Sequence, residues 1–204
     1  MIETKDKILD AAERLFGERG YAETSLRHII ADAGVNLAAI HYHFGSKEDL
    51  LVQLVRRRAE PINAGRLAAL DQAEAEAGPA SVSVEKILEA FLLPAAEAAA
   101  KRPEMTRLMG RLHAEGCIPP GIKSYFTPMV ERFIAAARRA LPHLPEEELL
   151  WRLRASAGAM AFTMLEPHAP QGDYLARARQ LVAFVSGGLR APASVVEAKV
   201  EVTQ

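Results

Sequence analysis

The sequence contains very little cysteine, with Cys117 as the one thiol among 204 residues. One thiol excludes a disulfide within the chain and a zinc site built from several cysteines, and it suits a reducing compartment. Long apolar runs are missing too, because apolar residues recur at helical spacing rather than in a stretch of about 18 or more, so no membrane span is expected. The start of the chain lacks a basic segment followed by an apolar one, and the sequence therefore predicts a cytoplasmic protein.

An excess of positive charge is also lacking. The chain has 25 Lys and Arg residues against 26 Asp and Glu residues, which gives a formal net charge of -1. Between residues 24 and 47, Arg27 and Lys47 oppose Asp32, so this segment is only weakly basic. Such a balance argues against nucleic acid as a bulk electrostatic partner. Any binding to DNA would have to depend on local geometry.

Motifs of catalysis and of metal binding are absent as well. The sequence has no His-Glu-x-x-His, no Gly-x-Ser-x-Gly and no glycine-rich phosphate loop. His41 and His43 are two residues apart, whereas helical histidines that share a metal usually stand three or four apart. The acidic residues 146–148 open a predicted helix, where negative charge complements the helix dipole without any catalytic role. The sequence predicts no enzyme, no cofactor and no metal.

Alternating patterns typical of strands are almost absent, while helical periodicity recurs throughout, so we predict an all-α fold. Pro61 should kink or end the long helix that begins after Ser46, because proline lacks a backbone donor and clashes with the preceding turn. Pro94 and Pro128 lie inside expected helices and should bend them. The expected helices span about 5–19, 26–34, 37–44, 47–77, 84–101, 103–115, 122–141, 146–166 and 173–189.

Two short helices joined by a tight turn with a glycine form the scaffold that places the second helix in the major groove of DNA. Residues 24–35 supply the first helix, capped by Thr24 or Ser25, and the turn at Gly34. Residues 37–44 supply the candidate recognition helix. A small core is expected beneath these helices, with surface borrowed from the helix that follows. Its expected members are Ile8, Leu15, Phe16, Leu26, Ile29, Ile40 and Phe44.

The same segment contains Ala-Ala-x-x-Leu-Phe-x-x-x-Gly-Tyr at residues 11–21, then Thr24, and Tyr-His-Phe at 42–44 followed by Ser-Lys at 46–47. With these motifs the first fifty residues or so resemble the N-terminal signature of the TetR family of transcriptional regulators. The resemblance implies a DNA-binding domain at 1–50, a helical effector-binding and dimerisation domain at 51–190, and a tail at 191–204. It also implies a regulator, most commonly a repressor, that a small molecule releases from a palindromic operator.

The resemblance implies that Thr24, Tyr42, His43 and Lys47 hold DNA phosphates, which positions the domain without reading sequence. Base reading is expected from the exposed start and outer face of the recognition helix, with a second-helix arginine close by. These expected base-reading residues are Leu37, Ala38, His41 and Arg27. The set is chemically sparse, so DNA shape should contribute to discrimination. A phosphate-bound or solvated Arg27 remains an alternative.

Dimerisation is expected, because a two-fold dimer places two recognition helices on successive major-groove faces. The last two predicted helices are the candidates for a four-helix interface between two chains. The alternative is that the same residues form core within one chain. The interface residues expected on this basis are Leu153, Ala157, Met160, Ala161, Leu181, Phe184, Val185 and Gly188.

The middle helices are rich in methionine and phenylalanine, which favours an apolar pocket for a small-molecule effector, although plain core has the same composition. The segment at residues 35–47 is similar to that of fatty-acid-responsive family members, so a fatty acid or acyl-CoA is the expected effector. Its head group could contact one of five polar side chains: His113, Arg111, Tyr125, Arg132 or His168. A regulator controlled by a protein partner, without any ligand, is the alternative. The expected pocket residues are Phe91, Met105, Leu108, Met109, Leu112, His113, Phe126, Met129, Phe133 and Phe162.

Overall fold

A computed structural model describes residues 3–165 and 173–194 of the chain. Every regular element in these two ranges is a helix, which confirms the all-α prediction. His168, one of the expected head-group contacts, and residues 195–204 of the expected tail lie outside the described residues. The helices are α1 (Thr4–Arg19), α2 (Leu26–Ala33), α3 (Leu37–Phe44), α4 (Lys47–Ala77), α5 (Val84–Lys101), α6 (Pro103–Ala114), α7 (Pro120–Ala140), α8 (Glu146–Leu165) and α9 (Tyr174–Arg190).

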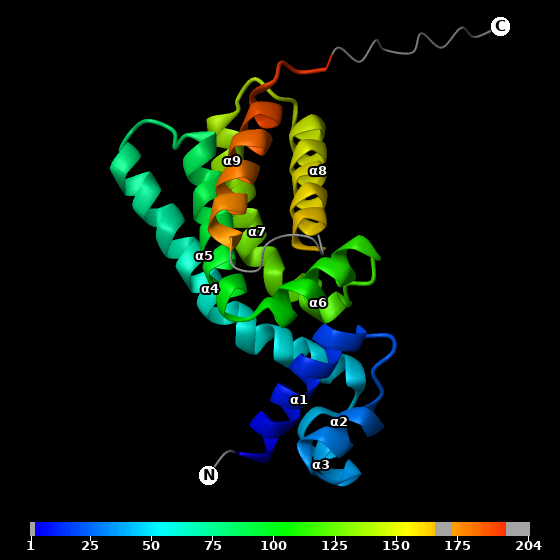
Figure 1. Cartoon of the computed structure of the whole chain (residues 1–204). Coiled ribbons are helices and arrows are strands. Elements are labelled where there is room, and N and C mark those ends of the chain that lie inside the picture. The colour runs from blue at the N-terminus through cyan, green and yellow to red at the C-terminus, as the bar shows by residue number, and fades with distance from the viewer. Residues whose placement is uncertain (1–2, 166–172, 195–204) are drawn as a thin grey trace, which may run out of the picture.

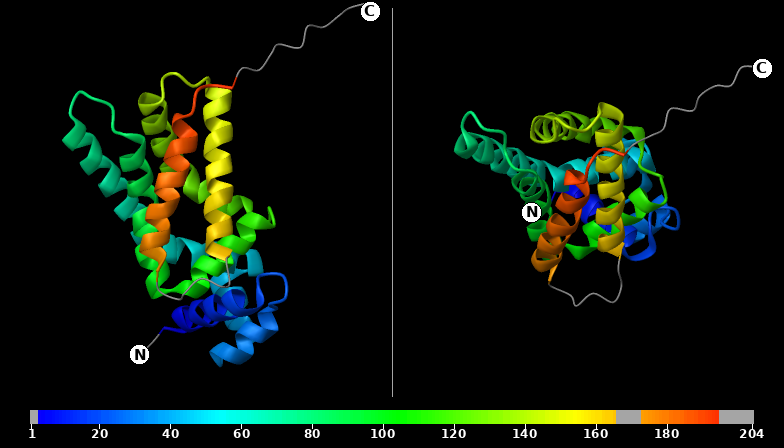
Figure 2. Two further views of the ribbon diagram at one scale, coloured as in Figure 1. Left: turned by 45° about the horizontal axis from the view of Figure 1, so that its top comes forward. Right: turned by 90° about the horizontal axis from the view of Figure 1, so that it is seen from above.

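The helices divide into an N-terminal unit (α1–α3) and a C-terminal half (α5–α9), which α4 connects. Figure 1 shows the N-terminal unit at one end of an elongated molecule, with α4 running from it into the C-terminal half. There α5, α7, α8 and α9 stand roughly upright, and α6 lies beneath them, next to the N-terminal unit (Figures 1 and 2). None of the described helices is long and apolar enough to cross a membrane.

Local side-chain caps determine where the short helices begin. The side chains of Ser25, Asn36 and Ser46 each accept a hydrogen bond from the backbone N–H three residues later, at the starts of α2, α3 and α4. Gly34 ends α2 in the left-handed conformation at φ 64°, which a residue with a side chain adopts only at a cost. Of the two expected caps of α2, Ser25 is therefore the one that caps.

The expected kink or stop at Pro61 does not end α4, which continues to Ala77. Proline removes one hydrogen bond, but the part of α4 beyond it is held by tertiary packing against α5 and α7. Asn63, Arg66 and Leu70 are buried in this second part of the helix. Packing thus outweighs the local preference to stop.

The core of the N-terminal unit is not confined to it. The expected residues from Ile8 to Phe44 are buried, apart from Leu26, which is half-buried. The same cluster includes Leu50, Leu51 and Leu54 of α4, and it extends to α6 and α7. The division of the chain near residue 50 stays a prediction, because one continuous core crosses that point. From α6 and α7 the cluster takes Met105, Leu108, Leu112 and Ile122.

Ion pairs add to this attachment of α1. Arg58 Nε donates to Glu13 Oε2 at 2.9 Å, and Arg57 Nη1 lies 3.0 Å from Asp6 Oδ1. Arg102, between α5 and α6, reaches the same Glu13 carboxylate at 3.4 Å. Glu13 is only 6% exposed, so its charge is compensated from two separate helical segments. This single carboxylate therefore ties α1 both to α4 and to the α5–α6 junction.

Gly17 marks the closest approach of α1 to α6. A Cβ atom at this position would lie 2.7 Å from the Cβ of Glu104 and 3.1 Å from its backbone. We expect Gly17→Ala to lower the free energy of unfolding by about 1–3 kcal/mol, because the overlap involves backbone that cannot move aside. Thermal and urea unfolding at a fixed protein concentration measure the change.

The matched control is Gly65→Ala in α4, where the added Cβ would make ordinary contact with Pro94 at 3.6 Å. Alanine is the better helix former, so this variant should be neutral or more stable by about 0.5–1 kcal/mol. Equal stability of the two variants would contradict tight α1–α6 packing.

Candidate functional sites

The tip of the N-terminal unit is formed by α2 and α3, at one end of the molecule (Figure 1). Arg27, Ala38, His41 and Tyr42 are all exposed there, and Tyr42 is 86% exposed. Leu37 begins α3, but its side chain is outside the described part. A large aromatic side chain that projects into solvent from a short helix has little value for folding. Most of the residues expected to face DNA are thus available at one tip.

Thr24 is a correction. Its side chain is completely buried, and its one hydroxyl proton is shared between the carbonyl oxygens of Leu15 at 3.1 Å and of Gly20 at 2.8 Å. The hydroxyl therefore fastens the end of α1 to the loop before α2 and cannot hold a phosphate. Ser25, one residue later, is exposed at the start of α2, where Ser25 and His28 cap one another, although His28 is not the Glu or Gln that marks such a cap in a sequence.

Lys47 lies against the N-terminal unit in this conformation. Its Nζ donates to the carbonyl oxygen of Ala22 at 3.3 Å and stands 4.3 Å from the centre of the Tyr21 ring. Burial lowers the pKa of Lys47, and the Glu23 carboxylate opposes that shift. His43 is half-buried and packs edge-on against Tyr42, with ring centres 5.0 Å apart. Both residues border the tip, and contact with phosphate stays a prediction that for Lys47 requires rotation of its side chain.

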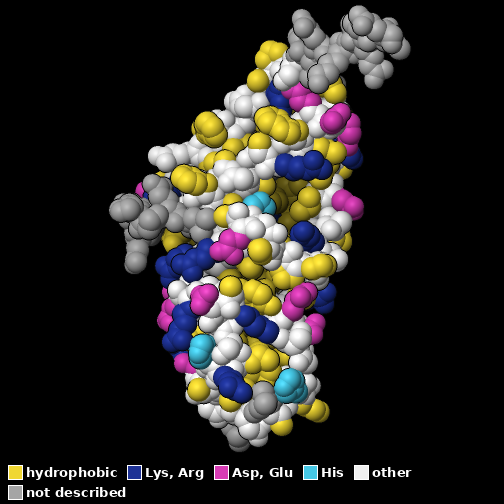
Figure 3. All heavy atoms as spheres, turned by 90° about the vertical axis from the view of Figure 1, so that its right-hand side faces the viewer, with side chains coloured by type: hydrophobic (Ala, Val, Ile, Leu, Met, Phe, Trp, Pro, Cys, Tyr) yellow, Lys and Arg dark blue, Asp and Glu magenta, His cyan; other side chains and the backbone are white. Residues whose placement is uncertain are grey.

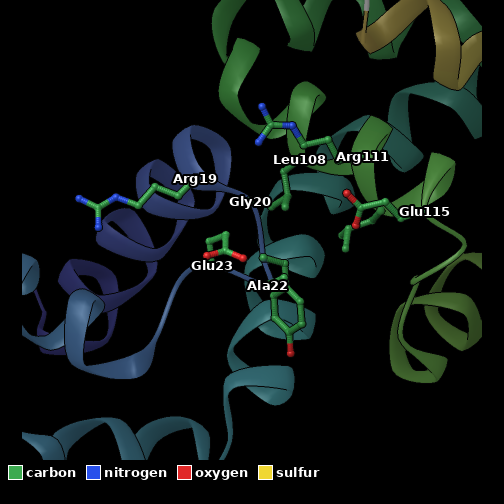
Figure 4. Close-up of a pocket in the computed structure, with 9 residues that line it drawn as sticks. Arg19, Gly20, Ala22, Glu23, Leu108, Arg111 and Glu115 are labelled. Atoms are coloured by element: carbon green, nitrogen blue, oxygen red, sulfur yellow. The ribbon is translucent and has the colours of Figure 1, made fainter.

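A cavity of about 290 Å³, the joint cavity, separates the end of α1 from α6. One wall carries Arg19 and Glu23, and the other carries Arg111 and Glu115, as Figure 4 shows. Leu108 and Leu112, two of the residues expected in an effector pocket, line this cavity and also belong to the core of the N-terminal unit. The cavity leaves room between α6 and the α1–α2 loop, beyond the tight contact at Gly17.

Only some of the residues expected in an effector pocket gather in the C-terminal half. Met129 and Phe133 are buried with half-buried Phe91, and the Phe91 and Phe133 rings meet edge to face at 5.2 Å. Phe126 packs on both this cluster and the N-terminal core. Figure 3 shows a hollow with hydrophobic side chains inside it in the C-terminal half of one face. These phenylalanines and Met129 stay the candidate pocket residues.

Four other expected pocket residues lie elsewhere. Met105 belongs to the N-terminal core, and half-buried Met109 packs against that core. His113 is exposed, and Phe162 is 74% exposed, so neither lines an interior pocket. Their helices present several faces, and the sequence period alone does not say which face the neighbouring helices cover.

A buried polar cluster lies beside the candidate pocket, and sequence reasoning missed its central member, Arg66. Its side chain donates to the carbonyl oxygen of Phe91 and to Asn63, and Asn63 also bonds to the side chain of Tyr125. Of the expected head-group contacts, Tyr125 is thus near this cluster. Arg132 instead pairs with Glu74 and Asp71, while Arg111 lines the joint cavity. The sequence offers no clear signal for Arg66, which shares the buried stripe of α4 with Asn63 and Leu70.

The α8/α9 face is the exposed side of the last two described helices, which stand side by side in Figure 2. Trp151, Phe162 and Phe184 are 65%, 74% and 74% exposed on it. The spacing of 151, 155, 158 and 162 puts Trp151, two small residues and Phe162 on one stripe of α8. Sequence reasoning missed Trp151, although this spacing could have found it.

The expected interface residues divide between this face and the interior. Ala161, Leu181 and Val185 are buried inside the chain, which corrects their assignment to an interface. Leu153, Ala157 and Met160 are half-buried, and Phe184 and Gly188 are exposed. Met160 and Leu181 also line a cavity of about 50 Å³, little more than the volume of one or two waters. The outward stripe, rather than the buried one, is what a second chain could contact.

A capped helix-turn-helix tip on a helical C-terminal half defines a class of protein, the helix-turn-helix transcriptional regulators, rather than an enzyme. The described residues contain no group of acidic, His and Cys side chains that could hold a metal. Residues 8–54 match the family model described as "Bacterial regulatory proteins, tetR family", and residues 89–188 match "Tetracyclin repressor-like, C-terminal domain". The chain belongs to the TetR family.

Curated relatives are similar over part of their length. The transcriptional regulator TtgR of Pseudomonas putida is 36% identical over 89 residues, which cover 44% of this chain and 41% of TtgR. IcaR of Staphylococcus aureus, a negative transcriptional regulator of a biofilm operon, is 42% identical over 52 residues, or 26% of this chain and 28% of IcaR. The matched segments thus span well under half of these relatives.

Solved structures agree over nearly the whole chain. A TetR-family regulatory protein from Rhodococcus RHA1 has a TM-score of 0.61 at 18% identity and covers 93% of this chain and 98% of that one. The ketosteroid regulator KstR2 of Mycobacterium tuberculosis has a TM-score of 0.62 at 18% identity and covers 92% and 95%. At this identity the likeness establishes the fold.

Thr24→Val tests the structural role of Thr24. The substitution removes the buried donor that the Leu15 and Gly20 carbonyl oxygens share, so we expect the free energy of unfolding to fall by about 1–3 kcal/mol. Binding of the folded protein to DNA, and its dependence on salt, should stay unchanged. Thr24→Ser keeps the hydroxyl and serves as the control. A stable valine variant with weakened, less salt-dependent DNA binding would instead restore the phosphate role.

Proposed function

We propose that the protein is a dimeric repressor that binds a palindromic operator and leaves it when a mainly apolar small molecule binds the C-terminal half. The observation that carries the DNA-binding part is the tip, where Arg27, His41 and Tyr42 project into solvent from two capped helices. Arg27 and His41 can donate to base edges, and Tyr42 can reach a phosphate. IcaR, which shares part of its sequence with this chain, is a negative regulator, and this supports repression.

The dimer is supported by the α8/α9 face. Three large apolar side chains this exposed are unusual on a monomer and mark a contact surface. Small residues between them, such as Gly158 and Gly187, have nothing within 4 Å of an added Cβ, so another helix can approach closely. Two copies that pair this face with itself form a closed two-fold assembly with both tips available to one DNA duplex.

Release from DNA is supported by the way the two parts of the chain are joined. Helix α4 carries the core of the N-terminal unit at one end and buried residues of the C-terminal half at the other. The joint cavity gives the N-terminal unit room to turn against α6. An effector shifts the spacing of the two tips only if it binds one spacing more tightly than the other. An effector that separates α5 from α7 around Phe91 and Phe133 would bind one spacing of the tips more tightly than the other.

Operator binding is tested with palindromic fragments from the DNA that flanks the coding region. We expect binding that weakens steeply with salt, and Lys47→Gln should reduce the logarithmic salt slope by about one for each half-site. Lys86→Gln removes an exposed lysine of α5 and should leave the slope unchanged. Binding that ignores salt, or an unchanged slope for Lys47→Gln, would contradict phosphate contact by Lys47.

Phe184→Arg tests the dimer. The substitution puts a cation on each α8/α9 face, and dimerisation through this face would bury that charge, so light scattering should show a monomer in place of a dimer. Operator affinity should fall by about tenfold or more, because the two tips then bind independently. Val130→Arg changes another exposed apolar residue, on α7, and should leave the dimer intact. A dimeric Phe184→Arg variant would place the interface elsewhere.

A further inference from the structure

Three charged side chains are buried among the described residues: Glu13, Arg66 and Arg152. Glu13 is held by Arg58 and Arg102, and Arg152 Nη2 lies 2.6 Å from Glu148 Oε1. Each of these two charges is therefore compensated by an opposite charge. Arg66 makes no ion pair with any residue in 3–165 or 173–194, so it is the exception.

The contacts of Arg66 are all with neutral groups. Nε donates to the carbonyl oxygen of Phe91 at 2.8 Å, and Nη1 donates to Asn63 Oδ1 at 3.2 Å. The guanidinium carbon lies 4.2 Å from the centre of the Phe91 ring. These two hydrogen bonds use two of the five N–H donors of a guanidinium, and Nη2 makes no hydrogen bond within the described chain. These contacts pack the Arg66 guanidinium and use part of its hydrogen-bonding capacity, but they leave its positive charge without an opposite charge.

An unpaired charge at 7% exposure is unfavourable, because little water can reach it. Burial lowers the pKa of Arg66 to about 10, and no carboxylate opposes that shift. A residue whose purpose was to hold α4 on α5 could do so without a charge, since apolar replacements of buried ionic groups are often as stable or more stable. Something outside the described chain that carries negative charge would remove this penalty.

We infer that Arg66 is the anchor for the carboxylate of a ligand, whose apolar body lies among Phe91, Met129 and Phe133. This rests on the proposed effector site and names its ligand class: a free carboxylic acid with an apolar body, rather than its ester or thioester. A guanidinium compensates one negative charge, so a carboxylate fits, while a phosphate dianion would leave a buried charge unpaired.

The surroundings of Arg66 suit such a ligand. Phe91 offers a ring face, Met129 is flexible, and all three apolar residues belong to one buried cluster. Pro94 lies within α5 next to this cluster and cannot donate to the preceding turn, so the α5 backbone near Phe91 is locally weakened. The carbonyl oxygen of Phe91 accepts a hydrogen bond from Arg66 Nε. Because it lies on this weakened segment, it can move aside when a carboxylate binds Arg66.

The test compares matched probes on the full chain by calorimetry and thermal unfolding: dodecanoate, 4-phenylbutanoate, methyl dodecanoate and dodecanoyl-coenzyme A. We expect at least one of the two acids to bind and stabilise the wild type, and the ester and thioester to bind more weakly by about tenfold to a hundredfold, since they lack the charged acceptor. Failure of both acids to bind, or equal binding of acid and ester or of acid and thioester, would overturn the assignment.

Arg66→Met is the decisive variant. We expect its unliganded melting temperature to stay the same or rise, while its affinity for the acid falls by about tenfold to a hundredfold. Arg152→Met removes a compensated buried arginine and should lower the melting temperature without selective loss of acid binding. A role of Arg66 in folding alone would reverse this pattern, with an unstable Arg66→Met variant that still binds the acid like the wild type.

Operator binding without ligand separates this inference from the proposed function. Arg66→Met should bind the operator as the wild type does, because Arg66 is far along α4 from the tip. If acids bind through Arg66 but leave operator binding unchanged, release by this effector is wrong and the carboxylate site stands. If the protein binds no operator at all, the calorimetric result for Arg66 is still decisive on its own.

Discussion

The rest of the structure depends on the apolar surface that the N-terminal unit shares with α4, α6 and α7. Helices of sixteen, eight and eight residues enclose too little apolar surface to be stable alone. Leu50, Leu54 and Leu108 complete that core from outside the unit. The tip is thus part of a folded body that includes helices of the C-terminal half, and a change in those helices alters the packing under the tip.

This shared core explains why few further contacts are needed to attach α1 to α4 and α6. Glu13 and the Gly17 contact fix α1 on α4 and α6, whereas the joint cavity lies just beyond them, at the α1–α2 loop. Motion is therefore expected as rotation about the α1–α6 contact rather than as separation of two domains. Packed interfaces of this kind shift between discrete arrangements, because they resist continuous deformation.

The parts of the fold that sequence predicted best are those fixed by local chemistry. Asn36 and Ser46 cap their helices, and Gly34 ends α2, so the boundaries of the helix-turn-helix follow from neighbouring residues. Thr24 shows the limit of this reasoning, since its burial depends on Leu15 and Gly20 of another element. The apolar residues of α8 and α9 show the same limit, because helical period separates faces but does not say which face a neighbour covers.

Arg66 lies beyond that limit for a different reason. In the sequence it is one arginine on a helix that also carries Arg56, Arg57 and Arg58, and the ordinary expectation for all of them is a solvated head group. Tertiary packing gives these arginines different partners. Arg57 and Arg58 form ion pairs with acidic residues of α1, while Arg66 contacts only neutral groups. The same helix thus carries paired charges where it holds the tip and an unpaired charge where it passes the apolar cluster. A carboxylate at Arg66 would change the balance of forces on α4 itself, so binding at that point would act directly on the helix that supports the tip.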